Sequence, residues 1–142
     1  MQPINKMRTE FLSKSSNEAF ARVVAAAFAA QTDPSIEVLA DIRTAVSEAV
    51  TNAIVHGYGE QEGMVVLGCT LYTGFIEIIV EDFGAGIEDI ERAKTPLFTT
   101  RPDLERSGMG FTVMETFMDS LEVESITGRG TKIRMTKQLE NR

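Results

Sequence analysis

Three polar side chains in the stretch SEAVTNAIVHGY, residues 47–58, could carry chemistry: Glu48, Asn52 and His56. They are four residues apart, so on an α-helix they would lie above one another on one face. A carboxylate, an amide and an imidazole can together hold a metal ion or accept a proton. Small side chains flank this column and are expected to leave room for a ligand: Ala45, Ala49 and Ala53.

A second polar position ends the predicted strand FIEIIVED, residues 75–82. Side chains alternate along a strand, so Asp82 points the same way as the apolar row before it, toward the helices. A carboxylate there must be paired or hydrogen-bonded, because burying a bare charge is costly. Gly84 and Gly86 follow at once and allow a sharp turn close to a flat or bulky group. The same alternation places the hydroxyl of Thr131 in this pocket.

The long connection from about Lys94 to Arg106 has two prolines and little periodicity, which is typical of a lid or a binding loop. It leads into Gly108 and Gly110, at the predicted start of a helix. Bare N–H groups and the positive end of the helix dipole make such a start a phosphate site. Arg106 stands beside it as a bidentate phosphate donor.

Capping residues and periodicity predict the elements that must position these groups. Ser15 and Glu18 suit a capping box, Asp33 and Pro34 suit the start of a second helix, and Gly57 suits its end. We expect an edge strand at 6–13, helices at 15–31 and 34–56, a hairpin at 63–82, a helix at 111–120 and a hairpin at 121–136. The apolar stripes expected on the two long helices are Phe20, Val23, Val24, Ala27 and Phe28, and Ile36, Leu39, Ile42, Val46, Val50 and Ile54.

This order predicts an α+β fold, a two-layer sandwich in which helices cover one face of a mixed, mostly antiparallel sheet. The length of 142 residues and the 43% hydrophobic content suit one domain over residues 1–142. A net charge of −7 argues against a nucleic-acid partner. The single cysteine, Cys69, excludes an intramolecular disulfide, and no apolar run is long enough to span a membrane. We therefore expect a soluble cytoplasmic protein.

Taken singly, each of these residues also fits an ordinary structural role. Glu48 and Asn52 could be solvent-facing helix residues, and Asp82 could start a turn. His56 suits the C-terminal end of a helix through its charge more than it suits a ligand or base. The combination, in this order and on these elements, is what indicates a functional site.

The combination resembles the ATP-binding domain shared by gyrase, Hsp90-type chaperones, histidine kinases and MutL proteins, which has the Bergerat-type fold. Its N box matches Glu48-x-x-x-Asn52, its first glycine box matches Asp82-x-Gly84-x-Gly86, and its second matches Gly108-x-Gly110. The resemblance covers essentially the whole chain. Within this superfamily the chain is most similar to the anti-sigma F factors of spore-forming bacteria, which are serine-protein kinases. Relatives that restrain stress-response sigma factors are the alternative.

The resemblance implies a role for each matched residue. Asn52 would ligate the Mg²⁺ that bridges the ATP phosphates, and Glu48 would be the general base. Asp82 would accept a hydrogen bond from the adenine amino group, supported by Thr131, while Gly84 and Gly86 pass close to the base. The implied phosphate contacts, beside an ATP lid at about 94–107, are Arg106, Gly108, Met109 and Gly110.

The resemblance also implies partners. The chain would hold a sigma factor away from RNA polymerase as an ATP-bound homodimer and would phosphorylate a serine of an anti-anti-sigma protein. Arg22, on the first helix, aligns with a family residue that contacts both partners, although a solvated helix charge fits it equally well.

Three other functions remain open at this point. A histidine-kinase domain would follow a phospho-accepting helical hairpin, for which the residues before the N box leave no obvious place. A gyrase-like or chaperone-like ATPase would need a second domain. A pure binding module has no need of a base such as Glu48.

Overall fold

The computed structural model describes residues 2–95 and 110–140. A short 3₁₀ turn, Ala30–Thr32, follows the first helix, and a π-helical turn, Ala53–Tyr58, follows the second. The remaining elements, in chain order, are β1 (Asn5–Leu12), α1 (Ser16–Ala29), α2 (Ile36–Asn52), β2 (Met64–Tyr72), β3 (Phe75–Asp82), α3 (Ile90–Ala93), α4 (Gly110–Phe117), β4 (Ser120–Ile126) and β5 (Gly130–Gln138).

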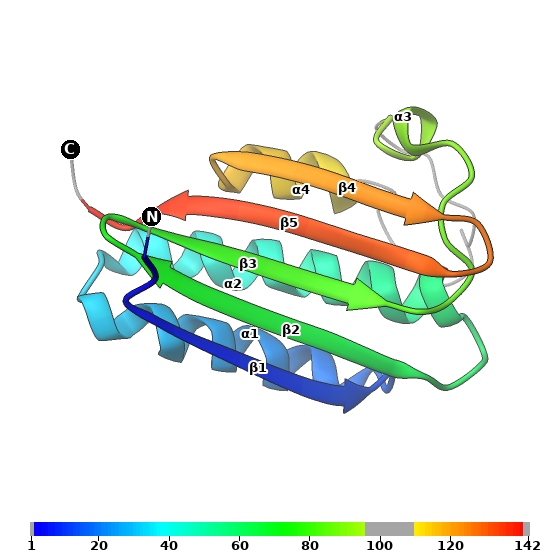
Figure 1. Ribbon diagram of the computed structural model, residues 1–142, viewed down its shortest axis with the longest axis horizontal. Helices are drawn as coiled ribbons and strands as arrows, with labels where there is room; N and C mark the ends of the chain where they lie inside the picture. The colour runs from blue at the N-terminus through cyan, green and yellow to red at the C-terminus, as the bar shows by residue number, and fades with distance from the viewer. Residues whose placement is uncertain (1, 96–109, 141–142) are drawn as a thin grey trace.

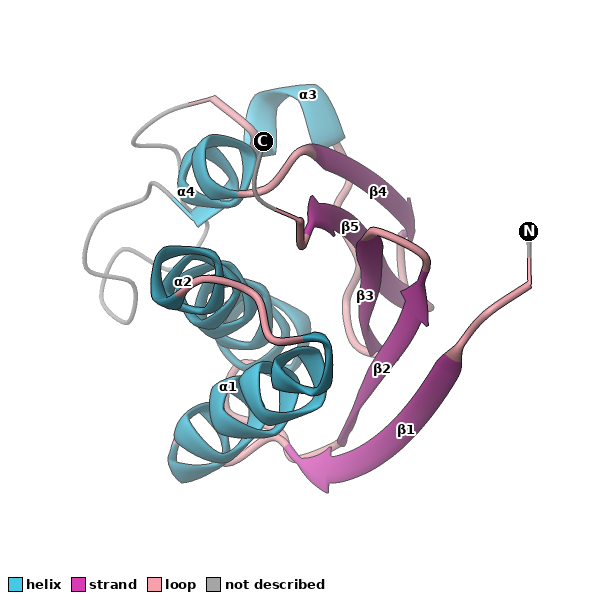
Figure 2. Ribbon diagram, turned by 90° about the vertical axis from the view of Figure 1, so that its left-hand side faces the viewer, coloured by secondary structure: helices cyan, strands magenta, loops and turns pink. Residues whose placement is uncertain are grey.

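The strands form one sheet in the order β1-β2-β3-β5-β4, and each neighbouring pair of these described strands is antiparallel. Helices α1, α2 and α4 lie side by side on one face of the sheet (Figure 1, Figure 2). The expected two-layer α+β sandwich is therefore confirmed. The last described strand, β5, lies inside the sheet between β3 and β4.

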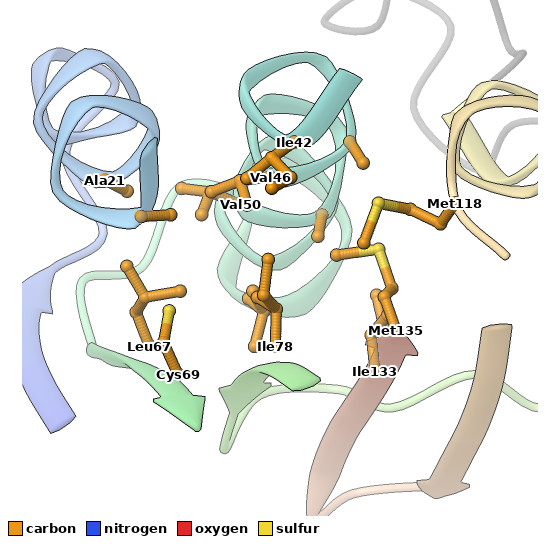
Figure 3. Packing of buried hydrophobic residues seen from close by; sticks show 14 of the residues in the cluster. Ala21, Ile42, Val46, Val50, Leu67, Cys69, Ile78, Met118, Ile133 and Met135 are labelled. Carbon is orange, nitrogen blue, oxygen red and sulfur yellow. The ribbon is translucent and has the colours of Figure 1, made fainter. Parts of the chain in front are cut away.

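The core fills the space between the central strands and α2. Ile42, Val46 and Val50 of α2 point toward Leu67, Ile78 and Met135 of the sheet (Figure 3). The strand residues alternate in burial, which is the pattern expected for a sheet covered on one face. The alternation places Asp82 on the same face as the core residues of β3.

Helix α1 turns a different face to the core from the one its large apolar residues predicted. Ala21, Ala25 and Ala29 are fully buried, whereas Phe20 is 48% exposed and Val23 59% exposed. The stripe prediction was wrong for these two residues and for Ala27, which is also exposed. Alanine side chains let a helix pack close to its neighbours, and α1 packs mainly against α2.

Both predicted helix starts need correction. Ser15 already has helical dihedral angles (φ −57°, ψ −30°) and its side chain makes no capping bond. Helix α2 begins two residues later than expected, because the hydroxyl of Ser35 accepts the N–H of Val38 at 3.1 Å. Asp33 is left-handed instead (φ 53°), a conformation that aspartate tolerates. Ile36 then lies at the open first turn and is 84% exposed, outside the core.

Candidate functional site

Glu48 and Asn52 lie one turn apart on the C-terminal half of α2, and both are half-buried. The structure thus keeps these two residues of the predicted column together. We had expected the alanines beside them to leave room for a ligand, and this prediction was wrong. Ala45, Ala49 and Ala53 are each at most 2% exposed. They belong to the hydrophobic core cluster, which also contains side chains of α4.

After Asn52 the helix widens into the π-helical turn. The N–H of Gly59 bonds to the carbonyl of Ile54, five residues earlier, at 3.0 Å. His56 lies inside this π-helical turn, outside α2 itself. The left-handed residue that ends the helix is Gly59 (φ 61°) and not Gly57, as the sequence suggested.

Gly57 has a steric role that sequence analysis missed. A Cβ atom at this position would lie 2.6–2.8 Å from the carboxyl atoms of Asp82. Only glycine lets the end of the helix approach this carboxylate so closely. A signal was available in the sequence, since HGYG contains two glycines and one residue suffices to end a helix.

The carboxylate of Asp82 is buried, with 3% of the residue exposed. It accepts the N–H of Gly84 at 3.0 Å and a backbone bond from Thr131. Burial raises the pKa of Asp82 to about 6, although both of these hydrogen bonds act to lower it. No lysine or arginine of the described residues pairs with it. The carboxylate can therefore accept a further donor from a ligand.

Gly84 and Gly86 are required by neighbouring backbone. A Cβ at Gly84 would lie 1.9 Å from the carbonyl oxygen of Gly57, which accepts the N–H of Ala85 at 2.8 Å. A Cβ at Gly86 (φ 76°) would lie 2.4 Å from the carbonyl oxygen of Ile126. The loop thus packs against the π-helical turn on one side and the end of β4 on the other. Its contact with a base remains a prediction.

Thr131 is 5% exposed and is the direct register partner of Asp82 across β3 and β5. Its hydroxyl lies 2.9 Å from that of Ser125 on β4. Ser125 was missed by sequence analysis, although strand alternation places it on the inner face, as it did Asp82.

Tyr58 was missed by sequence analysis as well. Its hydroxyl accepts the N–H of Phe83 at 2.8 Å and donates to the carbonyl of Met64.

Other predicted residues lie elsewhere. Arg106, Gly108 and Met109 fall outside the described residues, as does the lid after Thr95. Gly110 is the first residue of α4, and its contact with phosphate stays a prediction. Arg22 lies on α1 and pairs with Glu18 at 3.4 Å. In the described residues we find no cluster of three or more histidine, cysteine, aspartate or glutamate side chains that could hold a metal.

Residues 12–137 match the family model described as a histidine kinase-like ATPase domain. The anti-sigma F factor of Clostridium novyi is 62% identical over 138 residues, which are 96% of each chain. The anti-sigma F factor of Thermoanaerobacter sp. strain X514 is 60% identical over 98% of this chain and 97% of its own. This chain belongs to the anti-sigma F factor family.

The match to a histidine kinase-like ATPase domain supports ATP binding by this chain. The crystal structure of the RsbU and RsbW domains of Rv1364c from Mycobacterium tuberculosis has the same fold (TM-score 0.69, 20% identity). That similarity covers 96% of this chain and 32% of the mycobacterial chain. No helix among the described residues is long and apolar enough to cross a membrane.

Proposed function

We propose that this chain is an ATP-dependent anti-sigma factor. It sequesters a sporulation sigma factor and transfers phosphate from ATP to a serine of its anti-anti-sigma antagonist. The names of relatives at about 60% identity support the first part, and the histidine kinase-like ATPase domain supports the use of ATP.

The observation that carries the nucleotide site is the buried carboxylate of Asp82, at the end of β3. It packs against Gly57, which lies in the π-helical turn that follows Glu48 and Asn52 in the chain. An exocyclic amino group is a donor that such a carboxylate can recognise. A nucleotide with its base at Asp82 can extend its phosphates toward Asn52 and the start of α4.

The residues of α2 fit a magnesium ion. Mg²⁺ keeps several waters and takes most of its remaining ligands from substrate phosphates, so it needs few protein ligands. The amide oxygen of Asn52 would hold it, in keeping with the absence of a larger acidic cluster from the described residues. When bound, Mg·ATP supplies the phosphoryl group and the positive charge that opposes the phosphate oxygens.

The remaining steps belong to side chains and amides of this chain. Glu48, one helical turn from Asn52, would accept the proton of the substrate serine hydroxyl. The serine oxygen would bond to the γ-phosphorus while the bond from that phosphorus to the β,γ-bridging oxygen breaks and ADP leaves. The amide at Gly110 and the dipole of α4 stabilise the phosphate charge. Asp82 holds the base so that the phosphates stay in line with the serine.

The protein partners follow from the same proposal. The chain is a single ATP-binding domain that works in the cytoplasm as a homodimer, with its lid at about 94–107, and it binds neither nucleic acid nor membrane. Arg22 contacts the sigma factor and the anti-anti-sigma protein. In support, Phe20 and Val23 leave α1 with exposed apolar surface in the same segment as Arg22.

A phosphotransfer assay tests the function. The parent protein and Glu48→Gln are incubated with labelled ATP, Mg²⁺ and the anti-anti-sigma protein encoded nearest to this gene. We expect acid-stable phosphoserine from the parent and a loss of 10²-fold or more in Glu48→Gln, which is on the order expected for removal of a general base. Glu37→Gln, in the exposed first turn of the same helix, serves as the matched control.

Other products would assign other functions. Acid-labile label on histidine would contradict the serine kinase and indicate a histidine kinase. Free phosphate without labelled protein would indicate an ATPase, and no turnover with intact ATP binding would indicate a nucleotide-gated clamp.

A further inference from the structure

Three polar side chains form a row across neighbouring strands at the nucleotide site. Asp82 on β3 is the register partner of Thr131 on β5, and Thr131 is the register partner of Ser125 on β4. All three lie on the face of the sheet that the helices cover. Direct partners in antiparallel strands have adjacent side chains, so Ser125 contacts the pocket through Thr131.

The hydroxyl of Ser125 has three neighbours. It accepts the N–H of Ile87, in the segment after the first glycine box, at 2.6 Å. It donates to the carbonyl of Gly130 at 3.0 Å. Its third neighbour is the hydroxyl of Thr131 at 2.9 Å, where either oxygen could donate.

The inventory of protons decides the direction of that third bond. A serine hydroxyl has one proton and two lone pairs. The amide of Ile87 can only donate and the carbonyl of Gly130 can only accept, so all three contacts are hydrogen bonds at once only when the proton of Ser125 goes to Gly130. In that arrangement Thr131 donates its own proton to Ser125. Its oxygen is left with lone pairs, beside the carboxylate of Asp82.

We propose that Ser125 is a positioning residue that sets base specificity by making Thr131 a hydrogen-bond acceptor. This deepens the proposed function and rests on it. A 6-amino purine presents N–H donors to the two acceptors, Thr131 and Asp82. A 6-oxo purine presents an oxygen with lone pairs to the same wall, and unpaired polar atoms at a binding site oppose binding strongly.

Removing the hydroxyl of Ser125 would remove the hydrogen bond that keeps the Thr131 proton turned away from the ligand. In Ser125→Ala the hydroxyl of Thr131 can turn and donate toward the ligand, so a 6-oxo group becomes acceptable. We expect the ratio of ATP affinity to inosine triphosphate affinity to fall about tenfold, the size of one hydrogen bond made or lost. Ser125→Thr keeps the hydroxyl and should restore the parent ratio.

The experiment measures equilibrium binding of ATP and of inosine triphosphate, each with Mg²⁺, to the full chain. Ser120→Ala is the matched control, because Ser120 also lies on β4 with its hydroxyl bonded to a threonine of β5, Thr136, at 2.5 Å. Its ratio should equal that of the parent. Ser125→Cys, which keeps the size with a weaker acceptor, should shift the ratio in the same direction and covers a folding failure of the alanine variant.

Two results would overturn the inference while the proposed function stands. One is an unchanged ratio in Ser125→Ala and Ser125→Cys. The other is an equal loss of both affinities, since a purely structural role lowers both alike. A parent protein that binds neither nucleotide would instead refute the proposed function, and this inference with it.

Discussion

The carboxyl group of Asp82 lies directly against Gly57, where a Cβ atom would stand 2.6 Å from the carboxyl carbon. The contact joins the π-helical end of α2 to the end of β3. It joins the carboxylate proposed to bind the base to the helix that carries the residues proposed to act on phosphate.

Gly57→Ala should therefore disturb the site more than the rest of the fold. We expect ATP affinity to fall at least tenfold and the free energy of unfolding to fall by about 1–3 kcal/mol, as for other overpacked sites. Calorimetric titration and thermal melting measure the two effects. Gly68→Ala is the control, since its nearest atom would be 3.9 Å away; equal behaviour of the two variants would contradict the prediction.

The pKa of Asp82, raised to about 6 from 3.8, predicts how the ligand-free protein responds to pH. The folded state holds the Asp82 proton more tightly than the unfolded state does. The contribution of this proton to the free energy of unfolding is therefore complete below about pH 4 and is lost as the pH rises through 6. The change is on the order of 2–3 kcal/mol. Chemical denaturation from pH 4 to 7 should show it in the parent and not in Asp82→Asn.

ATP binding should depend on pH in the opposite direction. The ionised carboxylate accepts the amino N–H of adenine, so affinity should rise as Asp82 loses its proton near pH 6. Titrations at pH 5 and pH 8 measure the difference. Equal affinity at both values would show that Asp82 does not bind the base in its charged form.

Asn52→Ala should remove the dependence of nucleotide binding on Mg²⁺. In the parent we expect ATP to bind more tightly with Mg²⁺ than with a chelator, and in the variant we expect the two affinities to converge. The control is Thr51→Ala, at the position just before Asn52 on the same helix. An equal ATP affinity with and without Mg²⁺ in the parent would exclude the metal assignment.

Lys137→Met should destabilise the fold. The Lys137 ammonium lies 3.1 Å from the Asp41 carboxylate and 2.7 Å from the carbonyl of Phe117, and its side chain is 14% exposed. Losing it leaves Asp41 half-buried without its cation, so we expect about 1–3 kcal/mol of destabilisation in denaturant titrations. Lys14→Met removes an exposed ion pair to Glu62 and should cost well under 1 kcal/mol.

Strand alternation predicted the inner face of the site correctly. It placed Asp82 and Thr131 toward the helices, and both are buried there as register partners. The prediction succeeds because side chains alternate between the two faces of a strand, so the apolar residues of one face fix the direction of every other side chain. The same rule would have found Ser125.

The helices were less predictable, for physical reasons. In α1 the alanines and the larger apolar residues both recur at helical spacing, and only packing against α2 decides which face is buried. The π-helical turn after Asn52 depends on contacts of Gly57 with Asp82 and Ala85, which lie more than twenty residues away in the chain. Local propensity carries no trace of such contacts.

The place of β5 within the sheet affects how the site can form during folding. This strand comes last among those described, yet it separates β3 from β4 and supplies Thr131 to the pocket. Pairing across forty-nine residues, from Asp82 to Thr131, is a long-range contact, and such contacts form slowly. A growing chain on the ribosome thus cannot pair Thr131 with Asp82, and cannot complete the proposed base-binding site, until β5 has emerged and inserted between its neighbours.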